Sequence, residues 1–150
     1  MSETTIHPTA FVDPTAQIGK GCVIKAFALI GKNAVIGEGC VIGAYTEVRA
    51  GCVLGDRVRT GSKCTLTNGT QVGEDSLLSA NFTSTDKPDL HNPSLSLPPR
   101  FGARFRAGVR VTTMPGVVFG DDVVVGACSQ VRHSIPSGEV WFGNPAKKHR

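Results

Sequence analysis

One stretch of 17 residues, Ser84 to Arg100, holds the side chains that are best suited to acid–base chemistry. It reads STDKPDLHNPSLSLPPR and contains Asp86, Asp89 and His91. A carboxylate can hold a substrate ammonium or take its proton, and histidine changes charge nearest neutral pH. The four prolines of the stretch exclude a continuous strand or helix. We therefore expect a long loop, and long loops in compact domains are usually functional.

The remainder of the sequence repeats every six residues. Counting from Ile6 to Leu78, the first position of each hexad is a branched aliphatic residue in twelve of thirteen cases. The second position is often glycine, which tolerates the dihedral angles of a turn, and the fifth is small except at Val58 and Phe82. The pattern resumes from Phe101 to Pro136 with larger fifth positions, which gives nineteen hexads and one interruption.

Repeats this short predict an all-β fold, a parallel β-helix solenoid. Each hexad would form a short strand and a turn, and three hexads would complete one triangular coil. With a spacing of ~4.8 Å between coils, about six coils would form a prism roughly 30 Å long. We expect a single domain over residues 1–150, with an excursion loop at 84–100 and a C-terminal tail at 137–150.

Composition excludes several classes of function. The net charge is only +4, and no basic stripe is interleaved with aromatic residues, so nucleic acid is not an expected partner. No apolar run reaches 18 residues and the N-terminus lacks a hydrophobic signal core, so we expect a cytoplasmic protein without a membrane partner.

The five cysteines form no CxxC pair and predict neither a disulfide framework nor a metal site. Cys22, Cys40, Cys52 and Cys64 all occupy the small fifth position of a hexad, where a thiol acts as a compact hydrophobe.

Five segments make the chain resemble the hexapeptide-repeat acyltransferases, and among them the sugar-nucleotide N-acetyltransferases. They are HPTAFVDPTAQIGKGCVI, SANFTSTD, LHNP, TMPGVVFGDDVVVGACSQVRHSIP and WFGNPAKK. The resemblance implies a left-handed β-helix, although the general crossover rule favours the right-handed form. It also implies a homotrimer that transfers acetyl from acetyl-CoA to an amino group of a nucleotide-linked amino sugar, in the synthesis of cell-surface polysaccharide or glycan precursors.

The same resemblance suggests which residues act on the acceptor. The subgroup commonly has an asparagine near the sugar amine. Alignment from the left puts Asp86 at that place, and alignment from the right on LHNP puts Asp89 there. Asn81 is a second candidate, either as an amide directed at the sugar or thioester or as a turn residue. His91 is an alternative general base, as in many acyltransferases of this fold.

The resemblance also suggests the groups that bind CoA. A turn amide beyond the loop, at Gly108 or Gly126, would donate to the thioester oxyanion. In the tail, Lys147 would lie near the CoA nucleotide with Lys148 beside it, and Trp141 and Phe142 would cap the prism or stack near adenine. Outward arginines could reach phosphates or form a solvated basic face; they are Arg104, Arg106 and Arg110.

Two other functions stay open on the sequence. One is an O-acetyltransferase of the same fold with His91 as its base. The other is a non-catalytic β-helix subunit, because an aspartate replaces the usual asparagine. A carbonic anhydrase of this fold is excluded, because it needs three paired metal-binding histidines and the four histidines here are scattered.

Overall fold

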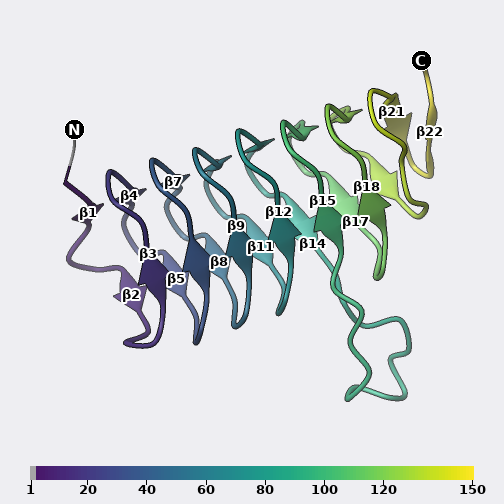
Figure 1. Ribbon diagram of the computed structural model, residues 1–150. Coiled ribbons are helices and arrows are strands. Elements are labelled where there is room, and N and C mark those ends of the chain that lie inside the picture. Colours follow the sequence, from purple (N-terminus) through teal and green to yellow (C-terminus); the bar gives the residue numbers. More distant parts are fainter. Residues whose placement is uncertain (1–2) are drawn as a thin grey trace.

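A computed structural model describes residues 3–150 of the chain. Within that range the protein contains 22 strands and no helix, so the predicted all-β parallel solenoid is confirmed. The coils stack along one axis, with the two termini at opposite ends (Figure 1). None of the described residues forms a helix with the length and apolarity that crossing a bilayer requires.

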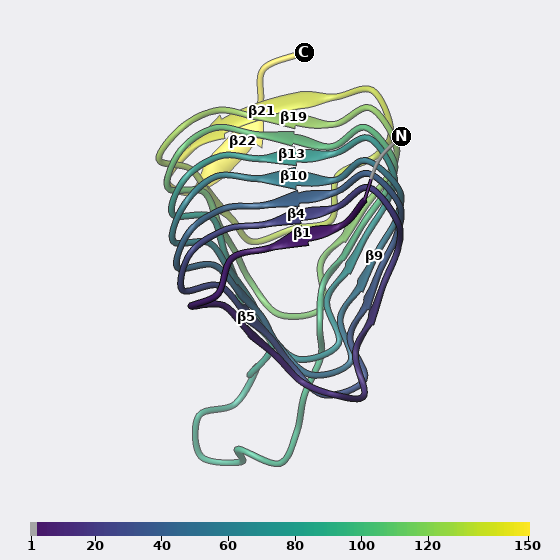
Figure 2. The ribbon, with the colours of Figure 1, turned by 90° about the vertical axis from the view of Figure 1, so that its left-hand side faces the viewer.

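The strands fall into three sheets, which form the three sides of a triangular prism (Figure 2). Sheet A has nine strands: β1 (Thr5–Ile6), β4 (Val23–Ile24), β7 (Val41–Ile42), β10 (Arg59–Thr60), β13 (Leu77–Leu78), β16 (Arg106–Ala107), β19 (Val124–Val125), β21 (Val140–Gly143) and β22 (Ala146–Lys148). Sheet B has seven: β2 (Phe11–Val12), β5 (Leu29–Ile30), β8 (Glu47–Val48), β11 (Thr65–Leu66), β14 (Thr83–Ser84), β17 (Thr112–Thr113) and β20 (Gln130–Val131). Sheet C has six: β3 (Gln17–Ile18), β6 (Val35–Ile36), β9 (Val53–Leu54), β12 (Gln71–Val72), β15 (Arg100–Phe101) and β18 (Val118–Phe119).

All pairings between successive coils are parallel, and a residue usually lies over the one 18 places later. Ile6 pairs with Ile24, and Ile36 pairs with Leu54. The chain runs from sheet A to sheet B to sheet C and back, so the prism has an A–B corner, a B–C corner and a C–A corner. The left-handed winding stays a prediction from the resemblance.

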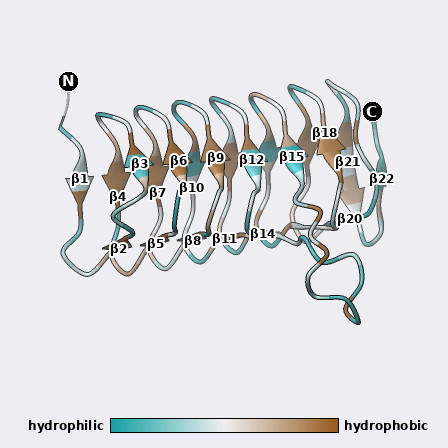
Figure 3. Ribbon diagram, turned by 60° about the horizontal axis from the view of Figure 1, so that its bottom comes forward, coloured by the Kyte–Doolittle hydropathy of each residue, from teal (hydrophilic) through white to brown (hydrophobic). Residues whose placement is uncertain are grey.

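The first and fifth positions of the hexads supply the core, as predicted. Ile30, Ile42 and Leu66 are fully buried first-position residues, while Cys40 and Cys64 are fully buried at the corners. Figure 3 shows hydrophobic colour on most strands and hydrophilic colour at many corners. Burial of this column of aliphatic side chains is the main favourable contribution to folding.

The second-position glycines have a different role from the predicted one. None of them lies in the left-handed region of φ. A Cβ at Gly61 would lie 2.6 Å from the backbone nitrogen of Ala80, and a Cβ at Gly108 would lie 2.6 Å from that of Ala127. Glycine is needed there because the next coil passes too close for a side chain.

The unusual backbone angles occur two residues later in the hexad. Eleven residues other than glycine have a positive φ, and all occupy this fourth position, among them Phe27 (59°), Tyr45 (59°) and Asn81 (63°). Such angles cost a residue with a Cβ of the order of 1 kcal/mol, so the repeated hydrogen bonds of the corner must offset that cost.

The predicted count of about six coils is too low, because the solenoid has about eight turns. The six-residue pattern does not reveal strand β14, because its inward residue is Ser84 rather than an aliphatic residue. At the C-terminal end, β21 pairs in parallel with β19 and extends sheet A by another turn. Because Ser84 and Arg100 belong to strands, the excursion itself spans residues 85–99.

Four aromatic rings form a cluster in the core beside the excursion, and of the larger corner residues of the second half only Phe105 belongs to it. Phe82, Phe101, Phe105 and Phe119 are all buried. The ring of Phe101 lies 4.8 Å from both Phe105 and Phe119, centroid to centroid, and Phe82 meets Phe101 edge-on at 5.6 Å. These rings fill the interior at the coils on either side of the excursion.

The C-terminal tail covers one end of the prism. Strands β21 and β22 form an antiparallel hairpin, and Trp141 packs against the core. Ala146 is also buried. Packing of Trp141 over the open coil end agrees with the predicted capping role.

We predict that Phe105→Ala lowers the free energy of unfolding by about 3–5 kcal/mol, the usual cost of removing a buried phenylalanine ring. The large effect is expected because Phe105 is fully buried among three other rings. Chemical denaturation followed by circular dichroism measures the change.

Phe27→Ala is the matched control, because Phe27 is 53% exposed at a corner. It should cost less than half as much as Phe105→Ala. Equal losses in the two variants would contradict the packing role of the aromatic core.

Candidate functional site

The excursion leaves and rejoins the prism at the B–C corner, and Asp86 lies at its base. The residue is only 7% exposed. Its carboxylate Oδ2 accepts a hydrogen bond from the Ser96 hydroxyl at 2.7 Å and lies 3.3 Å from the Lys87 ammonium. Its backbone carbonyl accepts the N–H of Leu97 at 2.7 Å. Asp86 therefore links the segment of the loop that leaves the prism to the segment that returns to it.

A hollow of about 650 Å³ lies beside this base. Threonine hydroxyls and the carboxylate of Asp86 line it together with apolar groups from the loop. The lining residues are Arg49, Thr65, Thr67, Thr83, Ser84, Thr85, Asp86, Lys87, Pro88, Leu90, Met114 and Pro115. The lining thus combines one acid, two cations and a largely apolar surface, which suits a small ligand with a few polar groups.

The other two candidates in the loop are outside this hollow's lining. Asp89 is exposed, and its Oδ1 accepts the N–H of His91 at 2.9 Å, which forms a local turn. His91 is also exposed. Asp86 is thus the one of the three loop candidates that lines the hollow.

Asn81 lies at a different corner of the prism from Asp86. It occupies the A–B corner with φ of 63°, and its N–H donates to the carbonyl of Ser62. The two residues are five positions apart in the sequence, with β14 between them, so they can be at most about 16 Å apart at ~3.3 Å per residue. The fold does not bring the two side chains together within one chain, and the backbone of Asn81 has the angle of a corner residue.

The amides of Gly108 and Gly126 already have acceptors in the solenoid. Gly108 donates to Val125 and Gly126 donates to Trp141, each at 2.9 Å. Within residues 3–150, the following amides, of Val109 and Ala127, donate to no protein group. Sequence reasoning missed these two amides, because only the ladder of hydrogen bonds distinguishes them from the glycine amides before them.

In the tail, the two lysines differ in their partners. Lys148 forms an ion pair with Glu139 at 3.2 Å, and Glu139 also accepts a hydrogen bond from the Trp141 indole. The pKa of Glu139 is lowered, mainly by this indole hydrogen bond and then by Lys148. Lys147 is exposed on β22 and forms no ion pair with the described residues.

The three candidate arginines lie at separate places around sheet A. Arg104 forms a bidentate pair with Asp122, at 2.7 and 3.1 Å, on the C–A corner. Its guanidinium lowers the pKa of the Asp122 carboxyl through that hydrogen bond. Arg106 projects from β16 next to the same corner, whereas Arg110 is exposed on the A–B corner. They do not form one basic face.

The four inward cysteines are buried and free, as predicted from their position in the hexad. Burial raises the pKa of the Cys40 and Cys52 thiols to about 11. In the part of the chain that the structure describes, no three His, Cys, Asp or Glu side chains come close enough to hold a metal ion.

Comparison with known proteins adds a family match. The model of the bacterial transferase hexapeptide, six repeats long, matches residues 33–68. Those residues form strands of all three sheets, with the six-residue spacing of the first half of the solenoid.

Two solved structures resemble the whole described solenoid. A GDP-perosamine N-acetyl transferase from Caulobacter crescentus, crystallised as a histidine-to-alanine mutant with CoA and GDP-perosamine, is 26% identical with a TM-score of 0.68. The acetyltransferase domain of PglB from Neisseria gonorrhoeae is 26% identical with a TM-score of 0.64, and was also solved with acetyl coenzyme A. The alignments cover 99% and 97% of this chain, and 57% of each of those chains.

A relative known from its sequence is named for a different transfer. The lipopolysaccharide biosynthesis O-acetyl transferase WbbJ of Escherichia coli (strain K12) is 36% identical over 92 residues, 51% of this chain and 47% of the relative. The matches therefore cover only about half the length of these proteins, from 47% to 57%. The predicted resemblance to hexapeptide-repeat acyltransferases and sugar-nucleotide N-acetyltransferases is confirmed.

We predict that only one of the five thiols, Cys128, reacts rapidly with an aromatic disulfide reagent in the folded protein at pH 8. Cys128 is exposed, while the other four are buried. At this pH a thiol with a pKa of about 11 is almost entirely protonated and therefore a poor nucleophile. Absorbance at 412 nm counts the thiols, first in buffer and then in denaturant, where all five should react.

The same raised pKa values predict a loss of stability at alkaline pH. Above about pH 9 the unfolded chain loses thiol protons that the folded chain keeps, so the melting temperature should fall as pH rises toward 11. A Cys40→Ala, Cys52→Ala variant should show a shallower decline. Rapid reaction of several thiols in the native protein, or an unchanged decline in the variant, would contradict the assignment.

Proposed function

We propose that this protein is an acetyltransferase that moves acetyl from acetyl-CoA to an amino group of a nucleotide-linked amino sugar. The observation that carries the proposal is the nearly buried Asp86 carboxylate, which lines a hollow at the base of the excursion. Similarity over almost the whole chain to an N-acetyl transferase crystallised with CoA and GDP-perosamine supports it. The left-handed winding that the resemblance implies belongs to the same proposal.

The reaction is aminolysis of a thioester. The neutral amine donates its lone pair to the thioester carbonyl carbon, and the carbonyl π electrons form an oxyanion. The oxyanion then re-forms the C=O bond as the carbon–sulfur bond breaks, and CoA leaves as a thiolate. The nitrogen loses one proton in this sequence, so the products are an amide and, after protonation of the thiolate, free CoA.

Asp86 is proposed to hold the acceptor amine and take that proton. One carboxylate oxygen, Oδ2, is already fixed by Ser96 and Lys87. Oδ1 has no protein donor among the described residues, so it is the atom left for the substrate. A carboxylate held in this way loses little freedom when the ammonium binds, and general acid–base groups contribute about 10²–10⁴-fold. Asp89 stays the competing position for this role.

The oxyanion needs a hydrogen-bond donor, which is worth ~3 kcal/mol in such sites. The amides of Val109 and Ala127 have the unoccupied N–H groups that the role requires, and we propose them in place of Gly108 and Gly126. Both lie at the A–B corner, as does Asn81, whereas Asp86 lies at the B–C corner.

A site that uses both corners requires two copies of the chain. In a closed ring of parallel prisms, the B–C corner of one copy can face the A–B corner of the next at the same height. We therefore propose a homotrimer in which Asp86 and the oxyanion donor come from neighbouring subunits. Lys147 would contact a CoA phosphate as a charge-assisted partner, while Lys148 stays paired with Glu139.

A second candidate function is O-acetylation. The similarity to WbbJ favours it, because that relative is named as an O-acetyl transferase. A hydroxyl acceptor must lose its proton during attack, and its oxygen lone pairs are much less nucleophilic than that of an amine. It therefore depends more on a general base. His91, exposed in the excursion, would supply that base. The non-catalytic subunit is the outcome if neither acceptor is acetylated.

We predict acetyl transfer to at least one nucleotide-linked amino sugar, with kcat about 10²-fold lower in Asp86→Ala. The KM for acetyl-CoA should change little, because Asp86 acts on the acceptor. Mass spectrometry of products from a panel of UDP-, dTDP- and GDP-linked amino sugars identifies the acceptor. Matched sugars with a hydroxyl in place of the amine test O-acetylation.

Asp89→Ala is the matched acidic control, and His91→Ala distinguishes the two chemistries. Normal kcat in Asp86→Ala with a large loss in Asp89→Ala would move the amine position to Asp89. If His91→Ala loses activity and the wild type acetylates only the hydroxyl sugars, the protein is an O-acetyltransferase and the proposed N-acetylation is wrong. Absence of transfer from acetyl-CoA to either set would refute the enzyme assignment.

A further inference from the structure

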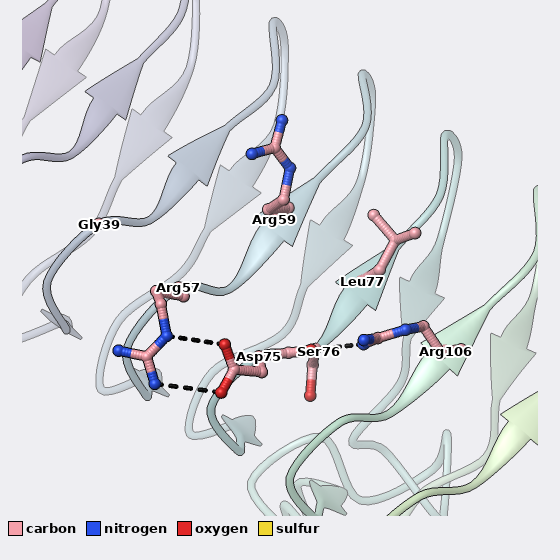
Figure 4. Close-up of a pocket in the computed structure, with 7 residues that line it drawn as sticks. All are labelled: Gly39, Arg57, Arg59, Asp75, Ser76, Leu77 and Arg106. Carbon is pink, nitrogen blue, oxygen red and sulfur yellow. Dashed lines mark hydrogen bonds and ion pairs between the residues drawn. The ribbon is translucent and has the colours of Figure 1, made fainter.

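A second hollow, of about 400 Å³, lies over sheet A beside the C–A corner, away from the base of the loop. Its lining is Gly39, Arg57, Arg59, Asp75, Ser76, Leu77 and Arg106 (Figure 4). Three arginines against one aspartate leave the lining with two net positive charges. None of Arg57, Arg59 and Leu77 has a role in the acetyl transfer described above.

Asp75 holds two of the three arginines in place. Its carboxylate accepts two hydrogen bonds from Arg57, at 2.7 and 3.1 Å, and its backbone carbonyl accepts one from Arg106. Hydrogen bonding to Arg57 is the main cause of the lowered pKa of the Asp75 carboxyl, so this acid stays ionised. Figure 4 shows Arg57 and Arg106 on either side of Asp75, with contacts to both.

The third arginine, Arg59, forms no ion pair or side-chain hydrogen bond within residues 3–150. It pairs in register with Leu77, which pairs with Arg106. The two arginine backbones are therefore two strand spacings apart, about 10 Å at ~4.8 Å each. Leu77 lies between them on the outer face of the sheet, and Figure 4 shows Arg106 directed toward Asp75 while Arg59 extends away from it.

The fold does not need arginine at these positions. Other outward residues in the same column of sheet A are Val23, Val41, Leu77 and Val124. The hollow also has room, because Gly39 has no side chain beside Arg57, and a smaller hollow of about 180 Å³ shares Gly39 and Arg57. An arginine pair that packing does not require, in an open hollow, indicates a role in binding.

We propose that this hollow binds a diphosphate group. Guanidinium groups bind phosphate oxygens through paired, charge-assisted hydrogen bonds, and two arginines that line one hollow can each bind one of two linked phosphates. A ligand bound to Arg59 and Arg106 leaves the Arg57–Asp75 ion pair intact. The charges of Arg59 and Arg106 are not neutralised by a carboxylate of the described residues, so they are available to the ligand. The hollow lies between β10 and β16, the same height on the axis at which the excursion leaves β14.

Both substrates of the proposed reaction carry a diphosphate, the nucleotide sugar between its nucleoside and sugar and CoA between its adenosine and pantetheine arms. Which of them places its diphosphate here rests on the proposed function. Binding of inorganic pyrophosphate does not, because it needs only the arginines.

Isothermal titration with inorganic pyrophosphate tests the proposal on the full chain. The wild type should bind pyrophosphate. The double variant that carries both Arg59→Gln and Arg106→Gln should bind it at least tenfold more weakly. Rising salt should weaken the wild-type binding, because the site is exposed to solvent. The matched control is Lys32→Gln, Arg132→Gln, which removes two charges from exposed corners outside both hollows.

The control variant should keep wild-type affinity and all three proteins should keep the same melting temperature. Equal affinity in the wild type and the arginine variant, or an equal loss in the control variant, would overturn the proposal. Failure of acetyl transfer with normal pyrophosphate binding would refute only the proposed enzyme.

A second set of titrations identifies the source of the diphosphate. UDP, GDP and dTDP stand for the acceptor, and CoA stands for the donor. Selective weakening of a nucleoside diphosphate in the arginine variant assigns the hollow to the acceptor, and selective weakening of CoA assigns it to the donor. Unchanged affinity for all four, despite weaker pyrophosphate binding, would overturn a substrate role for the hollow.

Discussion

The hydrogen-bonded spacing between coils is the constraint on which the rest of this structure depends. Each short strand is bonded to the strands above and below, at ~4.8 Å, so every side chain lies directly over its counterpart in the next coil. Because of this stacking, residues at equivalent positions of successive hexads form a continuous column along the prism. It explains why cysteines and aliphatic residues form continuous buried lines, and why a bidentate Arg57–Asp75 pair is repeated as Arg104–Asp122 higher on the same corner.

The same spacing determines which parts of the fold the sequence could predict. An aliphatic residue at every sixth position predicts a strand wherever it occurs, and each of the nineteen hexads begins in a strand. Ser84 does not fit this rule: it is polar, yet it lies in a strand and points inward. Its hydroxyl can be buried because it forms a hydrogen bond with the Thr70 hydroxyl inside the prism, at 2.9 Å. The role of the second-position glycine also escapes this rule, since a collision with the next coil involves residues 18 places away.

The candidate site was predictable in its location but not in its composition. The break in the repeat indicated the excursion, and the chemistry of a carboxylate indicated Asp86. Asn81 lies only five residues away in the sequence, yet a strand and a corner put it on another edge of the prism. Likewise, whether an amide is free depends on the partner carbonyl one coil away, which is why Val109 and Ala127 emerged only from the hydrogen bonds.

The excursion has one further consequence, for how such proteins change over time. Val72 pairs with Phe101, 29 residues later, as do the other pairs that span the excursion, whereas the pairs before it are 18 apart, as is Phe101 with Phe119 after it. The eleven additional residues are absorbed at a corner, where the chain leaves one sheet and has not yet joined the next. Insertions and deletions at that point therefore leave the pairing register of the strands unchanged. The length of this one segment, and with it the lining of the hollow at its base, can therefore vary while the six-residue repeat of the scaffold is preserved.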